Sequence, residues 1–224
     1  FITFMPKPTS GDWRSGAHIN LSLQKTDEPG VNIFGNETDG WSDESRWAVG
    51  GLIEHSEAIT AIACPVVNSY NGLVPRVGGF EGGTVTWAPT NITYGFNNRA
   101  AQFRLPQSRY CIENRAADMC MNIYLGLGMS IGGAVKGIQN KMEPGEPCNL
   151  NLYDMTDAQF EEAGIRRLPR NLMIALEALR NDELAKQVMG PVMLRSYLAY
   201  KDDEWERYHQ TVTDWEVKEY LRLF

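Results

Sequence analysis

Four arginines and one glutamate stand among apolar residues in a single stretch, NNRAAQFRLPQSRYCIENRAAD, and they are Arg99, Arg104, Arg109, Arg115 and Glu113. Arginines on strands often face solvent in ion pairs worth about 0–1 kcal/mol each. Guanidiniums directed inward would instead bind phosphate or carboxylate through paired hydrogen bonds. Glu113 and Arg115 are two residues apart and share a strand face, and Arg109 has the same parity. This spacing favours the inward arrangement, with a turn or bulge between Arg99 and Arg104.

A second set of polar residues alternates with apolar ones near the start of the chain. Ala17, Ile19, Leu21 and Leu23 are predicted on one face of a strand, and His18, Asn20 and Ser22 on the other. An imidazole beside a carboxylate suits Mg²⁺ or Mn²⁺ that bridges phosphates. The two stretches together predict a site for ATP phosphates, a divalent metal and an anionic substrate.

The composition limits the classes of protein to consider. The 224 residues are 43% hydrophobic and 22% charged, with a net charge of −7, as in a soluble globular protein that does not bind nucleic acid. No apolar run is long enough to cross a membrane. The four cysteines are scattered without a CxxC motif, which favours a reducing cytoplasm and argues against a zinc site.

The element pattern predicts an α+β fold, an antiparallel sheet with helices segregated to one side. Residues 1–115 are expected to be mostly strands with one helix from Ser42 to Cys64, and residues 116–224 mostly helical. A long helix is expected to begin at Asp118, with small residues on one side that allow close packing. Residues 68–87 contain five glycines and no helical period, as in a mobile flap or a backbone that approaches a ligand closely.

Six ordered motifs resemble the C-terminal catalytic half of the glutamine synthetase family: FMPKP, SGAHINLS, PVVNSYNGLVP, NNRAAQFRLP, CIENRAADMCMNIYL and VTDWEVKEYL. They cover essentially the whole chain, and the flap with TWAP is more similar to the branch of γ-glutamyl-amide ligases such as those that use methylamine. The resemblance implies a curved sheet lining a funnel-shaped active site with helices on the outer side. It also implies that an N-terminal domain and the first catalytic strands lie upstream of residue 1, and that the protein forms a ring-type homo-oligomer, with a dodecamer expected.

The resemblance also implies roles for individual residues. His18 and Glu113 match metal ligands. Asn20 and Ser22 match positions near the nucleotide. Arg99 and Arg104 match the NRxxxxR element that meets phosphates and substrate, and Arg115 matches the arginine at the reacting carboxylate. The residues implied to bind ATP are therefore Asn20, Ser22, Arg104 and Arg109, the last replacing an arginine that relatives often carry at Cys111.

Three departures from the family pattern concern the substrates. Gly72 stands where relatives have the arginine that holds the α-carboxylate of glutamate, and Trp13 and Arg14 replace an Asn-Gly pair. Either Arg14 takes over that carboxylate from the opposite wall, or the acid differs from glutamate. Trp13 forms either an apolar wall for an alkyl or aryl amine or part of the core. Glu81 is the only carboxylate between residues 73 and 87, and so is the candidate for accepting the proton of the amine.

The resemblance implies an ATP-dependent carboxylate–amine ligase. MgATP would phosphorylate the γ-carboxylate of glutamate, and an amine would then displace the phosphate, with Arg99, Arg115 and Glu81 in catalytic roles. Two alternatives stay open at this point. One is a glutamine synthetase that uses ammonia, and the other is a non-catalytic relative retained as an assembly or binding module.

Overall fold

The structure, a computed structural model, describes residues 2–77 and 83–224. Its helices are α1 (Asp43–Glu54), α2 (Ser56–Ala63), α3 (Val67–Tyr70), α4 (Ile123–Asn140), α5 (Asp157–Glu162), α6 (Leu172–Asn181), α7 (Glu183–His209) and α8 (Asp214–Tyr220). Its strands are β1 (Ile19–Leu21), β2 (Gly35–Asn36), β3 (Gly40–Trp41), β4 (Arg76–Val77), β5 (Thr84–Val85), β6 (Asn91–Ile92), β7 (Tyr94–Phe96), β8 (Phe103–Leu105), β9 (Ile112–Asn114) and β10 (Arg166–Arg167). The expected α+β class is confirmed.

The central sheet has four strands in the order β1-β9-β8-β7. Strand β9 pairs antiparallel with β1 and with β8, as expected, whereas β7 and β8 are parallel. A parallel connection must return along the length of a strand, and these strands are only three residues long, about 10 Å. The connection of residues 97–102 can therefore make this return without a helix.

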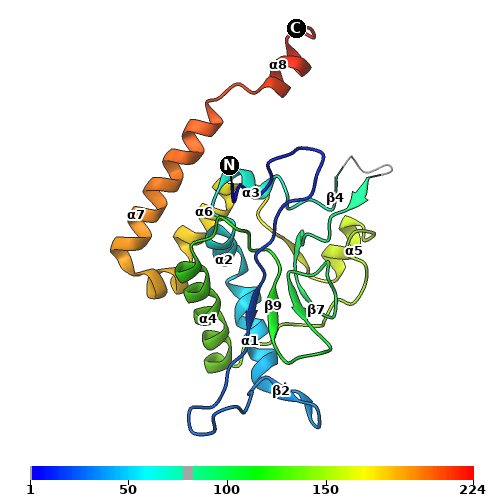
Figure 1. The fold of residues 1–224 in the computed structure, drawn as a ribbon, viewed down its shortest axis with the longest axis vertical. Coiled ribbons are helices and arrows are strands. Elements are labelled where there is room, and N and C mark those ends of the chain that lie inside the picture. Colours follow the sequence, from blue (N-terminus) through cyan, green and yellow to red (C-terminus); the bar gives the residue numbers. More distant parts are fainter. Residues whose placement is uncertain (1, 78–82) are drawn as a thin grey trace.

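The two faces of the sheet differ in polarity. Ile19, Leu21 and Ile112 are buried on one face, and Phe103 and Leu105 continue this face on β8. In Figure 1, α1, α2, α4 and α6 gather on one side of β9. The other face carries polar side chains, so the predicted alternation along residues 17–23 is confirmed.

The helical segment after Ser42 needs a correction, because it forms two helices and not one. The backbone leaves the helical conformation at His55 (φ −93°, ψ 11°), which ends α1 and precedes α2. With α3, the part of residues 1–115 that the structure describes contains three helices. His55 Nδ1 lies 2.8 Å from Asp182 Oδ2, and this contact anchors the break.

The helix expected from Asp118 begins five residues later, at Ile123. Asn122 is its N-cap, because its side chain accepts hydrogen bonds from the backbone N–H groups of Tyr124 and Leu125. The carboxylate of Asp118 instead accepts from the N–H of Cys120 and pairs with Arg14. Asp118 therefore belongs to the turn before the helix.

The C-terminal part of the chain extends away from the rest of the molecule (Figure 1). Helix α7 kinks at Gly190, whose φ of 72° lies in the left-handed region, directly before Pro191. The seven residues of α8 are all at least partly exposed. Among residues 2–77 and 83–224, no helix has the length and apolar character needed to cross a membrane.

Candidate active site

The polar face of the sheet centres on one carboxylate held by three side chains. Arg104 Nη1 donates to Glu113 Oε2 over 2.7 Å, and Arg115 Nη1 donates to Oε1 over 3.0 Å. His18 Nδ1 lies 2.8 Å from the same Oε1. Strand register produces this contact, because Glu113 is opposite Asn20 on β1 and opposite Arg104 on β8. The side chain of Glu113 is only 5% exposed.

The electrostatics of this cluster keep Glu113 ionised. Burial alone would raise its pKa, but hydrogen bonds from His18 and Arg104 and the charge of Arg115 lower the pKa to about 2. Burial also lowers the pKa of Arg115, an effect that the Glu113 charge opposes. Two guanidiniums therefore face one carboxylate. Arg104 Nε is buried and has no hydrogen-bond partner among the described residues.

Of the residues predicted to bind ATP, Arg104 lies on β8, and the others lie along or just after β1 and in the turn between β8 and β9. Arg109 Nη2 donates to Asn20 Oδ1 over 2.9 Å. Cys111 Sγ lies 3.7 Å from the same oxygen, so Arg109 lies close to Cys111, and its contact with ATP stays a prediction. Ser22 is exposed one residue beyond β1.

A cavity of about 380 Å³ opens over the cluster, and its walls are Trp13, His18, Thr86, Trp87, Arg99, Arg104, Glu113 and Arg115. Arg99 comes from the connection between β7 and β8, and its carbonyl accepts a hydrogen bond of 2.9 Å from Arg115 Nε. This connection supplies the turn that the spacing of Arg99 and Arg104 required. Trp13 is 50% exposed at this cavity and so is not a core residue.

Arg14 and Gly72 are neighbours across a smaller adjoining pocket of about 180 Å³. A Cβ atom at Gly72 would lie 2.6 Å from Arg14 Cγ and still closer to its Cβ and Cδ, so the arginine occupies the space of a side chain at position 72. Its guanidinium donates to Asp118 and to the carbonyl of Ala116, and the side chain is 4% exposed. The two departures from the family pattern thus compensate sterically, and carboxylate binding by Arg14 stays a prediction.

His18 and Glu113 are in direct contact, with 2.8 Å between His18 Nδ1 and Glu113 Oε1. This is the distance of a hydrogen bond, so a divalent ion held by both side chains would have to replace that contact. Metal binding by this pair stays a prediction. The described residues form no group of three or more His, Cys, Asp or Glu side chains that could hold a metal. Further ligands would therefore come from water, from substrate oxygens or from outside these residues.

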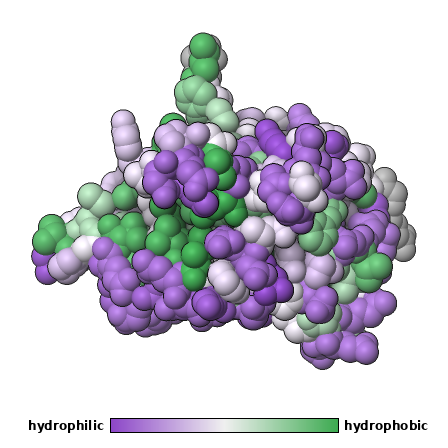
Figure 2. All heavy atoms as spheres, turned by 90° about the horizontal axis from the view of Figure 1, so that it is seen from below, coloured by the Kyte–Doolittle hydropathy of each residue, from purple (hydrophilic) through white to green (hydrophobic). Residues whose placement is uncertain are grey.

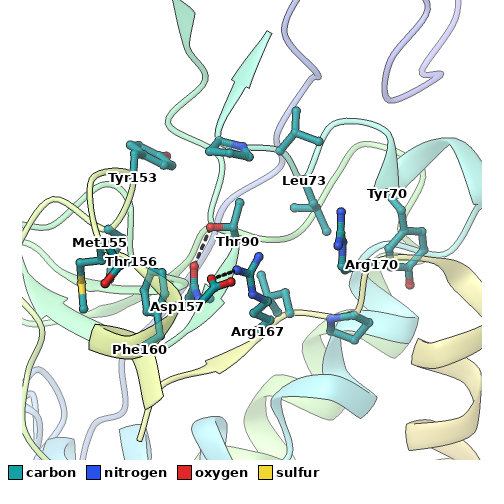
Figure 3. Close-up of a pocket in the computed structure, with 16 residues that line it drawn as sticks. Tyr70, Leu73, Thr90, Tyr153, Met155, Thr156, Asp157, Phe160, Arg167 and Arg170 are labelled. Atoms are coloured by element: carbon teal, nitrogen blue, oxygen red, sulfur yellow. Dashed lines mark hydrogen bonds and ion pairs between the residues drawn. The ribbon is translucent and has the colours of Figure 1, made fainter. Parts of the chain in front are cut away.

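The cluster of described residues around Glu113 includes neither Glu81 nor the walls of a second cavity. Glu81, predicted as the proton acceptor, lies outside the described residues. A second cavity of about 490 Å³ has walls from other parts of the chain, including Thr90, Tyr153 and Phe160 (Figure 3). Arg167 is paired there with Asp157.

Two residues of the site were not predicted from the sequence. Trp87 lines the cavity over the cluster, and Asp118 pairs with Arg14. The TWAP motif was the available signal for Trp87.

Comparison with known proteins agrees with this fold. The family described as "Glutamine synthetase, catalytic domain" matches residues 1–220. The glutamate–methylamine ligase of Methyloversatilis universalis is 40% identical over 99% of this chain and 49% of its own length. The glutamine synthetase of Methanosarcina mazei is 36% identical over 100% of this chain and 48% of its own. The solved structure titled "GmaS/ADP complex-Conformation 1" has a TM-score of 0.85 at 31% identity, over 98% of this chain and 49% of that chain.

The match along nearly the whole chain defines the class of catalytic domain. The chain belongs to the glutamine synthetase family, as its motifs indicated. It spans about half the length of the curated relatives that it matches.

Proposed function

We propose that the protein containing this chain is an ATP-dependent ligase that joins the γ-carboxylate of glutamate to an amine through a γ-glutamyl phosphate. The observation that carries the proposal is the buried Glu113, held by Arg104, Arg115 and His18 at the floor of an open cavity. Membership of the glutamine synthetase family supports it, as does the relative named glutamate–methylamine ligase.

The reaction has two steps with separate demands on the site. In the first, a γ-carboxylate oxygen attacks the terminal phosphorus of ATP, and the bond to the ADP oxygen breaks. In the second, the amine nitrogen attacks the acyl carbon, the carbon–oxygen bond to phosphate breaks, and phosphate leaves while a base takes the amine proton. Negative charge grows on phosphoryl and acyl oxygens in both steps, so positioned cations accelerate both.

The residues of the cavity divide these tasks. Arg99 and Arg115 would bind the reacting carboxylate and its acyl phosphate, with Arg104 toward the phosphates. Asn20, Ser22 and Arg109 would contact ATP farther along β1. His18 and Glu113 would hold Mg²⁺ or Mn²⁺, which neutralises phosphate charge when bound.

Arg14 is proposed to form the wall that faces the α-carboxylate of glutamate. Its place beside Gly72 supports this role, although a substrate would have to share the guanidinium with Asp118. The contrary possibility is an acid other than glutamate. Replacing Arg14 with Lys or Gln should raise the KM for glutamate and leave the KM for ATP unchanged. Equal effects on both constants would contradict the role.

Self-association into a ring-type homo-oligomer, with twelve subunits expected, is also proposed. Exposed apolar residues on and after α8 support it: Trp215, Val217, Tyr220, Leu221, Leu223 and Phe224. Figure 2 shows the molecule from below, where hydrophobic residues gather on one part of the surface beside hydrophilic ones.

All four cysteines are free thiols, which supports the proposal of a reducing, cytoplasmic location.

The test is phosphate release by the full-length protein with MgATP and glutamate. Ammonia, methylamine, ethylamine, putrescine and aniline are added in turn, and the γ-glutamyl product is identified by mass. Stimulation by an organic amine well above ammonia is the expected result. Arg115→Ala serves as a site control that should lose release with every amine. ATP binding without turnover in the wild type would contradict the proposal and favour a non-catalytic relative.

A glutamine synthetase that uses ammonia is the second candidate. The Methanosarcina mazei relative, at 36% identity, favours it. Ammonia preference in the same assay, with glutamine as the product, would decide for this candidate.

A further inference from the structure

We propose that Trp87 determines which amine is used, because its ring and that of Trp13 form an apolar wall for the substituent of an organic amine. The inference rests on the proposed ligase function and names the substrate class: primary amines with an apolar substituent. It concerns a residue that the motif comparison includes only as part of TWAP, without a role, and that the relatives' names do not identify.

The backbone of Trp87 has an unusual conformation. Its φ of 56° lies in the left-handed region, which bulky L residues rarely adopt. Such strain persists only where the surrounding structure fixes it, and it is concentrated at functional sites. The position of the indole is therefore determined by its neighbours and not by local preference.

Hydrogen bonds on both sides of Trp87 hold that conformation. Thr86 Oγ1 donates to the carbonyl of Val74 over 2.5 Å and accepts from the N–H of Ala88 over 3.2 Å. The hydroxyl of Tyr153 donates to the carbonyl of Ala88 over 2.8 Å. Arg115 Nη2 donates to the carbonyl of Trp87 itself over 3.4 Å. The last contact connects the indole-bearing residue directly to the arginine proposed to meet the reacting carboxylate.

The Tyr153 ring supports the indole from behind. The two ring centroids are 6.2 Å apart in an edge-to-face arrangement, a favourable geometry for aromatic pairs. Tyr153 comes from the wall of the second cavity, where Figure 3 labels it. A residue in the wall of that cavity therefore supports Trp87.

The exposed surface of Trp87 faces the proposed reaction site. Trp87 borders both pockets of the site and is 48% exposed, and Trp13, on the larger pocket, is 50% exposed. Their neighbours there are arginines, His18 and Glu113, so the indoles are the apolar part of a charged cavity. Ammonia has no substituent to place against such a wall, whereas an alkylamine does. A single methylene group in an apolar pocket changes kcat/KM by about 10–200-fold.

The test compares amines in the full-length protein with MgATP and glutamate. Propylamine and ethanolamine have similar length, but one ends in a methyl group and the other in a hydroxyl. The wild type should use propylamine with a kcat/KM at least about tenfold higher, in line with the discrimination expected of an apolar wall. An equal or reversed preference would overturn the inference without any variant.

Variants then separate the ring from the backbone. Trp87→Asn removes the ring but tolerates the left-handed conformation, so the ratio of kcat/KM for propylamine to that for ammonia should fall about tenfold or more. Trp87→Phe keeps an aromatic ring and should retain most of the preference. Trp47→Phe is the matched control, because Trp47 lies on α1 and bonds Glu143 away from the cavity. Its ratio should equal that of the wild type.

The failures of the two proposals are distinguishable. Turnover by the wild type with an unchanged ratio in Trp87→Asn would overturn this inference alone. An equal loss with ammonia and with propylamine would also overturn it, because Trp87 would then only support the fold. If the wild-type protein releases no phosphate with any of the amines, both the ligase function and this inference are overturned.

Discussion

At the scale of single residues, the site depends on pairs of side chains that are far apart in the sequence. Glu113 on β9 is held by His18, which lies far earlier in the sequence, just before β1, and by Arg104 on the neighbouring strand β8. Arg14 and Gly72 likewise meet across a pocket wall. In both cases the identity of one residue constrains the other, so single substitutions should have effects that a second substitution reverses.

The Arg14–Gly72 contact gives a first prediction. Gly72→Ala should lower the free energy of unfolding of the full-length protein by about 1–3 kcal/mol, because its new methyl group would collide with the arginine stem. Arg14→Ala in the same chain should remove that collision, so the double variant should be more stable than the sum of the single effects. Denaturant unfolding at fixed protein concentration measures this coupling. Strictly additive effects would show that the two residues are not in contact.

At the scale of elements, glycines allow α1 and α4 to approach closely. A Cβ atom at Gly51 on α1 would lie 2.6 Å from Gly137 Cα, and one at Gly137 would lie 2.9 Å from Gly51 Cα. The backbones leave no space for a side chain at either position. The small-residue face expected of this helix is therefore a helix–helix contact.

The second prediction uses two glycines of α4. Gly137→Ala should destabilise the protein by about 3 kcal/mol, at the upper end for overpacking, because backbone atoms cannot move aside as side chains do. Gly128→Ala is the matched control, since its Cβ would make an ordinary contact of 3.4 Å with Val188. That variant should gain about 0.5–1 kcal/mol from the better helix propensity of alanine. Thermal unfolding of both variants checks the pair, and equal shifts would contradict the predicted contact.

A third prediction concerns the junction between the α1–α2 break and α7. Asp182 accepts from the N–H of Ala185, which caps α7, and pairs with His55. Burial would raise the pKa of Asp182, but the His55 hydrogen bond and the cap lower it below its usual value. A depressed carboxyl pKa contributes stability above the unfolded pKa of about 3.9, and this contribution is lost as the pH falls through the folded pKa.

Asp182→Asn should therefore weaken the protein at pH 6 by about 1.5–3 kcal/mol while keeping an amide cap. The difference from the wild type should shrink as the pH falls below about 4. Urea unfolding between pH 3 and 7 measures it. A difference that is constant across this range would mean that the charge of Asp182 does not contribute.

At the scale of the whole molecule, the chain combines a packed body with a projecting C-terminal arm (Figure 1). Residues 210–224 carry exposed large apolar side chains, of which Leu221 is 74% exposed and Trp215 61% exposed. Exposed apolar surface of this kind marks interaction sites in proteins that are otherwise well packed. We therefore expect the arm, residues 210–224, to contact another subunit.

The fourth prediction is that the arm is needed for assembly. Deletion of residues 210–224 from the full-length protein should at least halve the mass of the assembly measured by light scattering. Replacement of both Trp215 and Leu221 by Ser, which keeps the chain length, should have the same effect. Replacement of Tyr200, exposed on α7 before the arm, by Ser is the control. An unchanged mass in the deletion variant would exclude the arm as a contact.

Several features followed from the sequence alone because they depend on short-range periodicity or on ordered motifs. Alternation placed His18 and Asn20 opposite Ile19 and Leu21, and a spacing of two placed Glu113 beside Arg115. The motifs identified the family, and the element pattern predicted the α+β class. The positions of helix ends were less predictable, because His55 and Asn122 act through contacts of their own.

Only the tertiary structure decided which residues meet. The register of β9 against β1 and β8 brought Glu113 between Asn20 and Arg104, and it depends on burial of the opposite face of the sheet. The packing of Arg14 against Gly72 and the strained backbone of Trp87 depend on contacts between distant segments. Residue types and spacing thus determine the chemistry that is available, whereas long-range packing determines where in the molecule that chemistry can occur.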